Sequence, residues 1–182
     1  MRRERVRLRP VIQRRLEEFG MRGFALFCVL LITSPALASD GEQRLLGLWK
    51  LESWNTEFKA TGEKKRFYGE RPNGYLVFTP EKRILGLITS EQRRKPESEQ
   101  ETIAAFWSMV AYSGTYRVEG DKWIMKIDVA WNESWTGTEQ LRFFKVEGDA
   151  LTVTSPWEPN PNLPGNPETR GVLVWRKVKI PR

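Results

Sequence analysis

The sequence contains no histidine and a single cysteine, Cys28. Cys28 lies in an apolar run near the N-terminus, so the chain beyond that run has neither a thiol nor an imidazole. These absences exclude disulfide bonds, thiol nucleophiles, Ser-His-Asp triads and zinc sites built on Cys or His. Any catalysis would have to use carboxylates, Lys, Tyr or Arg. The sequence therefore predicts no catalytic residue, no metal site and no cofactor.

Excess positive charge is also scarce outside the N-terminal segment, although the formal net charge is +7. Residues 1–38 hold eight Arg and three Glu, which leaves 22 basic and 20 acidic residues for 39–182, a net charge of +2. Nucleic-acid binding needs a clustered basic footprint. We therefore expect no nucleic-acid partner for the folded part of the chain.

The one long hydrophobic run, residues 24–33, contains no charge and follows a short basic start at 21–22. A small-x-small site at 36–38 completes the pattern of a secretory signal peptide. An uncleaved anchor helix is the alternative, but the run is shorter than the ~20 residues that a membrane span needs.

This pattern divides the chain at residue 38. Residues 1–38 are the expected leader, with Met21 as the expected true start or residues 1–20 as an unusually long basic region. Residues 39–182 are the expected folded domain. We expect a periplasmic or secreted protein with no membrane span after signal cleavage, and the sequence does not indicate an oligomeric state.

Apolar and polar residues alternate in short segments between residues 45 and 179, and turn signals such as Asn73-Gly74 separate the segments. Nine segments are expected as strands: 47–58, 65–68, 75–79, 83–89, 112–118, 123–131, 138–146, 151–154 and 172–178. Eight or nine antiparallel strands predict an all-β fold, a closed up-and-down barrel. Such a barrel is filled by side chains or holds one small ligand.

One helix is expected, from Glu99 to Val110. Ser98 and Glu101 form a capping-box pattern at its start. The apolar residues that share one face at helical spacing are Ile103, Phe106, Trp107 and Val110. Such a face must cover something. One interpretation is a short helix that caps one end of the barrel, and the other is a mobile lid over a ligand entrance.

Strand alternation predicts which side chains point into the barrel. The inward-facing candidates for ligand contact are Tyr112, Tyr116, Trp123, Met125, Trp131, Gln140 and Arg142. The two tyrosines are spaced to project into one cavity, where they could also act as acids. Trp131 and Trp135 flank a hairpin tip, which suits either a cavity mouth or simple packing. Trp49 and Trp175 are expected to fill one end of the barrel.

Gln140 and Arg142 share a face of the expected strand 138–146, whose two faces both mix polar and apolar residues. A guanidinium inside a barrel must be paired. A ligand carboxylate or phosphate would suit it, because Arg offers a planar fork of donors. The alternatives are an internal acid, such as Glu52 or Asp128, or exposure of Arg142 to solvent.

Five segments in order along the chain carry a family resemblance. They are Leu46-Gly47-Leu48-Trp49-Lys50-Leu51, Asn73-Gly74-Tyr75-Leu76-Val77-Phe78-Thr79-Pro80, Ala111-Tyr112-Ser113-Gly114-Thr115-Tyr116-Arg117-Val118, Trp135-Thr136-Gly137-Thr138-Glu139-Gln140-Leu141-Arg142 and Leu173-Val174-Trp175-Arg176. Together they resemble the bacterial and fungal lipocalin-like domain proteins, within the broader lipocalin-type barrels.

The resemblance implies a single closed barrel whose usual cargo is a small apolar ligand. It also implies that Arg176 stacks on Trp49. Many family members carry a histidine where this chain has Met125-Lys126-Ile127-Asp128. This departure removes the best candidate for catalytic chemistry.

Three functions follow as hypotheses. The first is a periplasmic or secreted protein that binds a small apolar or amphipathic, acidic ligand inside the barrel. The second is a small isomerase or cyclase that uses the cavity with Tyr or Glu as proton carrier. The third is a structural or protein-interaction module with a filled barrel.

Overall fold

The computed structural model describes residues 40–179. The expected leader over residues 1–38, with its start at Met21, lies outside the described residues. The elements are α1 (Asp40–Leu45), β1 (Gly47–Phe58), β2 (Lys64–Lys65), β3 (Asn73–Phe78), β4 (Arg83–Thr89), α2 (Glu99–Trp107), β5 (Met109–Glu119), β6 (Lys122–Ala130), the 3-10 helix η1 (Glu133–Trp135), β7 (Glu139–Glu147), β8 (Ala150–Thr154), β9 (Glu158–Pro159) and β10 (Glu168–Lys177). No helix among these residues is long and apolar enough to span a membrane.

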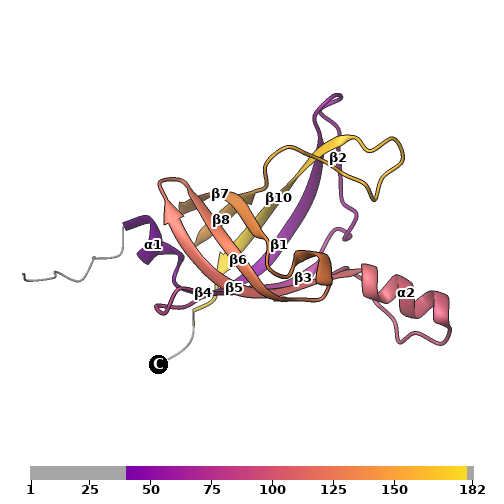
Figure 1. The fold of residues 1–182 in the computed structure, drawn as a ribbon, viewed down its shortest axis with the longest axis horizontal. Helices are drawn as coiled ribbons and strands as arrows, with labels where there is room; N and C mark the ends of the chain where they lie inside the picture. The colour runs from indigo at the N-terminus through magenta and orange to yellow at the C-terminus, as the bar shows by residue number, and fades with distance from the viewer. Residues whose placement is uncertain (1–39, 180–182) are drawn as a thin grey trace, which may run out of the picture. The chain divides into compact units, whose positions relative to one another are not determined.

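Eight of the strands form a closed antiparallel barrel (Figure 1). Each long strand pairs with the next along the chain from β1 through β3 to β8 and β10, and pairing of β1 with β10 closes the sheet. The two-residue strands β2 and β9 extend the far ends of β1 and β10. The predicted all-β, closed up-and-down barrel is therefore confirmed.

The barrel interior is a packed apolar core toward the end where α1 lies. Alternation places Trp123, Met125 and Ile127 of β6 inside, each 1% exposed. Trp49 and Trp175, expected to fill one end of the barrel, are both buried in this core. Phe78 packs edge-on against Trp123 at a centroid distance of 5.1 Å. The core therefore depends on aromatic contacts contributed by several strands.

Helix α1 closes this end of the barrel. Leu45, its last residue, is fully buried, and its carbonyl accepts a hydrogen bond from Trp49 Nε1 at 2.7 Å. The Lys177 ammonium lies 4.4 Å from the centre of the Trp49 ring. The prediction that Arg176 covers Trp49 is wrong: Arg176 Nε donates to Glu52 at 2.9 Å instead. Since Trp175 points inward, alternation turns Arg176 outward and Lys177 inward.

Helix α2 does not cap the barrel, which corrects the expected capping position. It projects from the connection between β4 and β5 (Figure 1) and has no buried residue. Ser98 caps it as expected, accepting from Glu101 N at 3.2 Å. The helix ends at Trp107 because β5 begins at Met109 and draws Val110 into the core. The barrel end is instead occupied by the short helix α1, which the sequence analysis did not identify.

A long two-stranded ribbon leaves the barrel wall. Beyond Lys50, β1 continues to pair with β10 but no longer pairs with β3. Beyond Val172, toward its N-terminus, β10 pairs with β1 but not with β8. We call residues 53–59 and 168–174 the β1–β10 ribbon. Because its β1 edge has separated from β3, and its β10 edge separates from β8 beyond Val172, the ribbon leaves an opening on each side.

Candidate ligand-binding site at the barrel mouth

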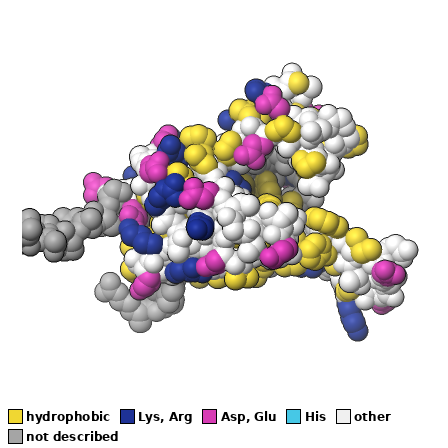
Figure 2. Space-filling model, in the orientation of Figure 1, with side chains coloured by type: hydrophobic (Ala, Val, Ile, Leu, Met, Phe, Trp, Pro, Cys, Tyr) yellow, Lys and Arg dark blue, Asp and Glu magenta, His cyan; other side chains and the backbone are white. Residues whose placement is uncertain are grey.

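One opening lies between β7 and the ribbon. β8 pairs with β7 only from Phe143 to Glu147 and ends at Thr154, just before Pro156, which cannot donate to a sheet. The first half of β7 therefore has a strand partner only in β6. Figure 2 shows the molecule hollowed between the end where β2 and β10 lie and the body formed by β5, β6 and β7, with hydrophobic side chains in the hollow. We call this hollow the barrel mouth.

Arg142 and Gln140 face the interior of the barrel. Arg142 lies opposite Trp123, and Gln140 lies opposite Met125, and residues directly opposite in an antiparallel pair share a face. Arg142 donates to Gln140 Oε1 at 2.8 Å and to the carbonyl of Leu141 at 2.7 Å. These two bonds leave part of the five-donor fork without a partner.

No acidic side chain among residues 40–179 forms an ion pair with Arg142. Asp128 pairs with Arg83 on the outer surface, and Glu52 pairs with Arg176. Both internal acids considered from the sequence are thus engaged elsewhere. Burial lowers the pKa of Arg142, and the nearby Tyr112 and Glu158 oppose this shift only in part. The site therefore holds a partly buried cation that attracts Glu158 but contacts no acidic side chain among the described residues.

Tyr112 lies on the same side of the barrel. A Cβ atom on Gly86 of the neighbouring strand would come within 2.5 Å of the Tyr112 ring, so the ring lies directly over this glycine. Burial raises the pKa of Tyr112, and it also raises the pKa of Tyr116. Both phenols are therefore weaker acids than a free tyrosine. The role of Gly86 was not identified from the sequence, because it depends on strand pairing.

Trp131 and Trp135 extend this aromatic wall. Their rings meet edge to face with centroids 4.8 Å apart, and Trp135 lies 6.2 Å from Tyr112. The short helix η1 holds Trp135 in place, with Asn132 accepting from Ser134 N at 3.1 Å. Both indoles are partly buried. The hairpin tip therefore packs against Tyr112.

The ribbon contributes Trp54, and the connection between β2 and β3 contributes Tyr68; sequence reasoning missed both. Their rings stack at a centroid distance of 4.1 Å and an interplanar angle of 11°. Plain alternation from Leu51 would place Ser53 inside. A β-bulge between Leu51 and Ser53 shifts the alternation by one residue, so Trp54 lies opposite Leu173 on the inner face.

Four buried indole N–H groups have no acceptor among the described residues: those of Trp54, Trp123, Trp131 and Trp175. A buried indole N–H normally donates to a partner. Trp54 and Trp131 belong to the partly buried side chains that surround the core. They add two neutral donors to the unused donors of Arg142.

The predicted site residues divide into two groups. Tyr116, Trp123 and Met125 lie deep in the packed core, at most 4% exposed. Tyr112, Trp131, Gln140 and Arg142 are only partly buried. Their role in binding stays a prediction. Within residues 40–179 no three Cys, Asp or Glu side chains gather as metal ligands.

Comparison with known proteins identifies the family. The sequence pattern of the family described as a lipocalin-like domain matches residues 46–178. Similar solved structures include a lipocalin-like protein from Bacteroides uniformis, with 10% identity, a TM-score of 0.41, and coverage of 74% of this chain and 99% of that one. An uncharacterized protein from Bacteroides eggerthii is also similar, with 12% identity and a TM-score of 0.38, and the match covers 74% of this chain and 99% of that one. Comparison with curated proteins gives no match. This chain belongs to the lipocalin-like domain family.

Proposed function

We propose that this protein binds a small amphipathic molecule with an acidic head at the barrel mouth. The observation that carries this proposal is Arg142, a partly buried guanidinium with two hydrogen bonds and no acidic partner within residues 40–179. A buried cation without a counter-ion is costly. A carboxylate or phosphate from a ligand would supply the missing charge and accept the unused donors.

The apolar part of the ligand would lie among the aromatic side chains that flank the mouth. These are Trp54 and Tyr68 on the ribbon side and Tyr112, Trp131 and Trp135 on the barrel side. Ligand pockets are commonly apolar with a few polar groups that fix orientation. Gln140 is positioned to orient Arg142, because its Oε1 accepts from the guanidinium.

The depth of binding is limited by the core. Trp123, Met125 and Tyr116 pack tightly beneath the mouth, so the ligand of this proposal rests above them rather than filling the whole barrel. A mouth-bound ligand of this kind would quench or shift tryptophan fluorescence, because Trp54 and Trp131 flank the mouth.

We further propose that the protein acts in the periplasm or outside the cell. The basic start, uncharged apolar run and small-x-small site within residues 21–38 support this proposal.

The test is a titration of the purified protein with oleate and with methyl oleate, followed by tryptophan fluorescence. The two probes share a tail and differ in the charge of the head. We expect the wild type to bind oleate about 10- to 100-fold more tightly, since a hydrogen bond to a charged group contributes about 1.5–3 kcal/mol. Arg142→Ala should remove this preference.

Arg117→Ala is the matched control. Arg117 is exposed on β5 and pairs with Glu119 and Glu139 on the outer surface. Its loss should leave the preference for oleate unchanged. Equal binding of both probes by the wild type, or an unchanged preference in Arg142→Ala, would refute the role of Arg142.

A further inference from the structure

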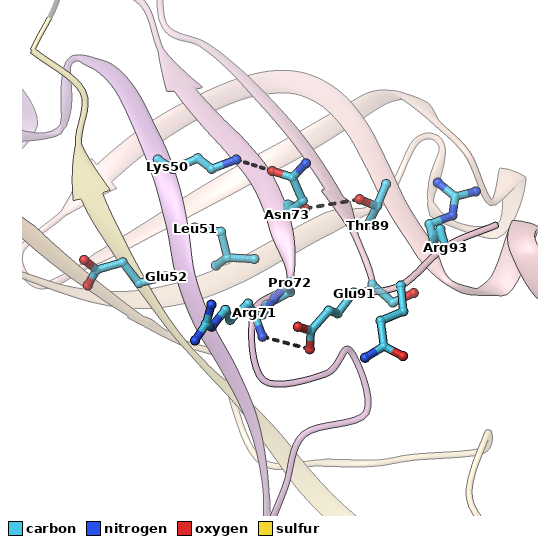
Figure 3. Close-up of a pocket in the computed structure, with 11 residues that line it drawn as sticks. Lys50, Leu51, Glu52, Arg71, Pro72, Asn73, Thr89, Glu91 and Arg93 are labelled. Atoms are coloured by element: carbon cyan, nitrogen blue, oxygen red, sulfur yellow. Dashed lines mark hydrogen bonds between the residues drawn. The ribbon is translucent and has the colours of Figure 1, made fainter.

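A second opening lies on the other side of the ribbon, between β1 and β3. It contains a pocket of about 570 Å³, a size typical of small-molecule sites. Figure 3 shows Leu51 and Pro72 in the middle of the pocket and charged side chains around it. None of the residues considered for the barrel mouth lines this pocket.

The pairing of β1 with β3 explains where the pocket forms. These strands pair from Gly47 to Lys50 and separate after the pair of Lys50 with Tyr75. Continuing the register would place Ser53 opposite Pro72, which has no backbone N–H to donate, so the ladder cannot resume there. The loop after β4, which carries Glu91 and Arg93, closes the opposite side.

The two acids that line the pocket are already engaged. Glu52 accepts two bonds from Arg176, at 2.9 and 3.0 Å. Glu91 Oε2 accepts from the backbone N–H groups of Glu70 and Arg71, at 2.9 and 3.2 Å. Their negative charge is therefore directed at Arg176 and at the backbone.

The three cations that line the pocket have no acidic partner among the described residues. Lys50 donates to Asn73 and lies 4.3 Å from the centre of the Tyr75 ring. Arg93 donates to the carbonyl of Ala105 at 3.1 Å. The Arg71 guanidinium makes no hydrogen bond or ion pair with residues 40–179. The pocket lining thus carries more positive than negative charge, three cations against Glu52 and Glu91, with Arg71 as its least engaged donor.

We propose that this pocket is a binding site for a small molecule that carries at least two negative charges, such as a phosphate ester or a polycarboxylate. Arg71 is its main contact, because its planar fork of donors matches carboxylate and phosphate oxygens. Lys50 and Arg93 add charge at the rim, and Leu51 and Pro72 form an apolar floor. The site is separate from the barrel mouth and does not depend on Arg142.

The test is isothermal titration calorimetry of the full chain with inorganic phosphate, citrate and acetate at low ionic strength. We expect saturable binding of citrate and phosphate, and at least 10-fold weaker binding of the monovalent acetate. Arg71→Ala should weaken citrate binding by at least 10-fold. Arg94→Ala is the matched control, because this neighbouring arginine does not line the pocket. The Arg94→Ala protein should bind citrate with the affinity of the wild type.

Two further measurements separate the possible outcomes. Amide shifts on citrate addition should concentrate at Thr89 and Ser90, which line the pocket. Arg142→Ala should bind citrate like the wild type, so failure of the barrel-mouth proposal leaves this site standing. Absence of saturable citrate and phosphate binding, equal loss in Arg94→Ala, or full affinity in a folded Arg71→Ala protein would overturn the proposal.

Discussion

Trp123 on β6 lies directly opposite Arg142 on β7, and both side chains point into the barrel. Trp123 belongs to the packed core, with an N–H that has no acceptor among the described residues. Arg142 is therefore a charged side chain on the inner face, at the same level as a residue of the packed core. This cross-strand pair brings a guanidinium that could bind an acidic group directly beside the aromatic core.

Arg142→Met should stabilise the protein. Replacing a buried charge by an apolar side chain of similar length removes a desolvation cost, and comparable replacements are neutral or stabilising by about 1–4 kcal/mol. We expect a gain of about 1–3 kcal/mol in the free energy of unfolding, measured by urea denaturation at pH 7. Binding of an acidic ligand should be lost at the same time.

Arg117→Met is the control for this substitution. Arg117 is exposed and its pair with Glu139 is 2.8 Å long. Exposed pairs contribute about 0–1 kcal/mol, so this change should be small and destabilising. A clear loss of stability in Arg142→Met would instead mean that the folded protein already neutralises this guanidinium.

Leu45→Ala should destabilise the protein by about 2–5 kcal/mol, the usual cost of removing a fully buried leucine side chain. Leu45 is 0% exposed and ends the helix that closes the barrel. Phe106→Ala on α2 should change stability by less than about 0.5 kcal/mol, because its ring is 41% exposed. Thermal unfolding of both variants checks that α1, and not α2, closes the barrel. An equal loss of stability in the two variants would contradict this.

Gly86→Ala should destabilise the protein by about 1–3 kcal/mol, as expected for overpacking. The new methyl group would come within 2.5 Å of a Tyr112 ring carbon. Tyr112→Leu should recover part of the loss, because a smaller side chain relieves the contact. A double-mutant cycle by urea denaturation measures this coupling, and strictly additive effects would show that the Tyr112 ring does not lie over Gly86.

The barrel itself was predictable from the sequence because alternation and turn residues are local signals. β6 illustrates this: its inward residues Trp123 and Met125 follow a strict period of two. Closure of the barrel by pairing of the first and last long strands was also predictable, because eight or nine antiparallel strands suit a small closed barrel. Arg142 was correctly placed on the inner face, but its lack of an acidic partner depends on which strands carry Glu52 and Asp128 and which way these residues turn.

Other features required the folded structure. The bulge after Leu51 reverses the inward phase of β1, and no turn residue in the sequence marks it. Trp54 was therefore missed as an inner residue. The apolar face of α2 was read as a covering face, although the helix lies in a connection that carries it away from the barrel. The pocket between β1 and β3 likewise depends on where the pairing of these two strands ends, which no residue pattern marks.

Acid should destabilise the protein through Glu57, one of its few buried charged side chains. Lys64 lies 2.8 Å from this carboxylate, and Arg170 lies 2.7 Å from its other oxygen. The hydrogen bond from Lys64, aided by Arg170 and opposed by burial, lowers the pKa of Glu57 below its ordinary value of 4.5. The unfolded chain therefore binds more protons than the folded chain as the pH falls below about 4.5, and stability is lost there.

Glu57→Gln should flatten this part of the pH dependence, because its side chain does not titrate. The measurement is the free energy of unfolding in urea between pH 3 and pH 6. Glu168→Gln is the control: Glu168 pairs with Lys59 on the same ribbon at 2.8 Å, but both side chains are about half exposed. Its slope should follow the wild type. A slope in Glu57→Gln equal to that of the wild type would show that the pairing of Glu57 with Lys64 and Arg170 does not contribute to acid sensitivity.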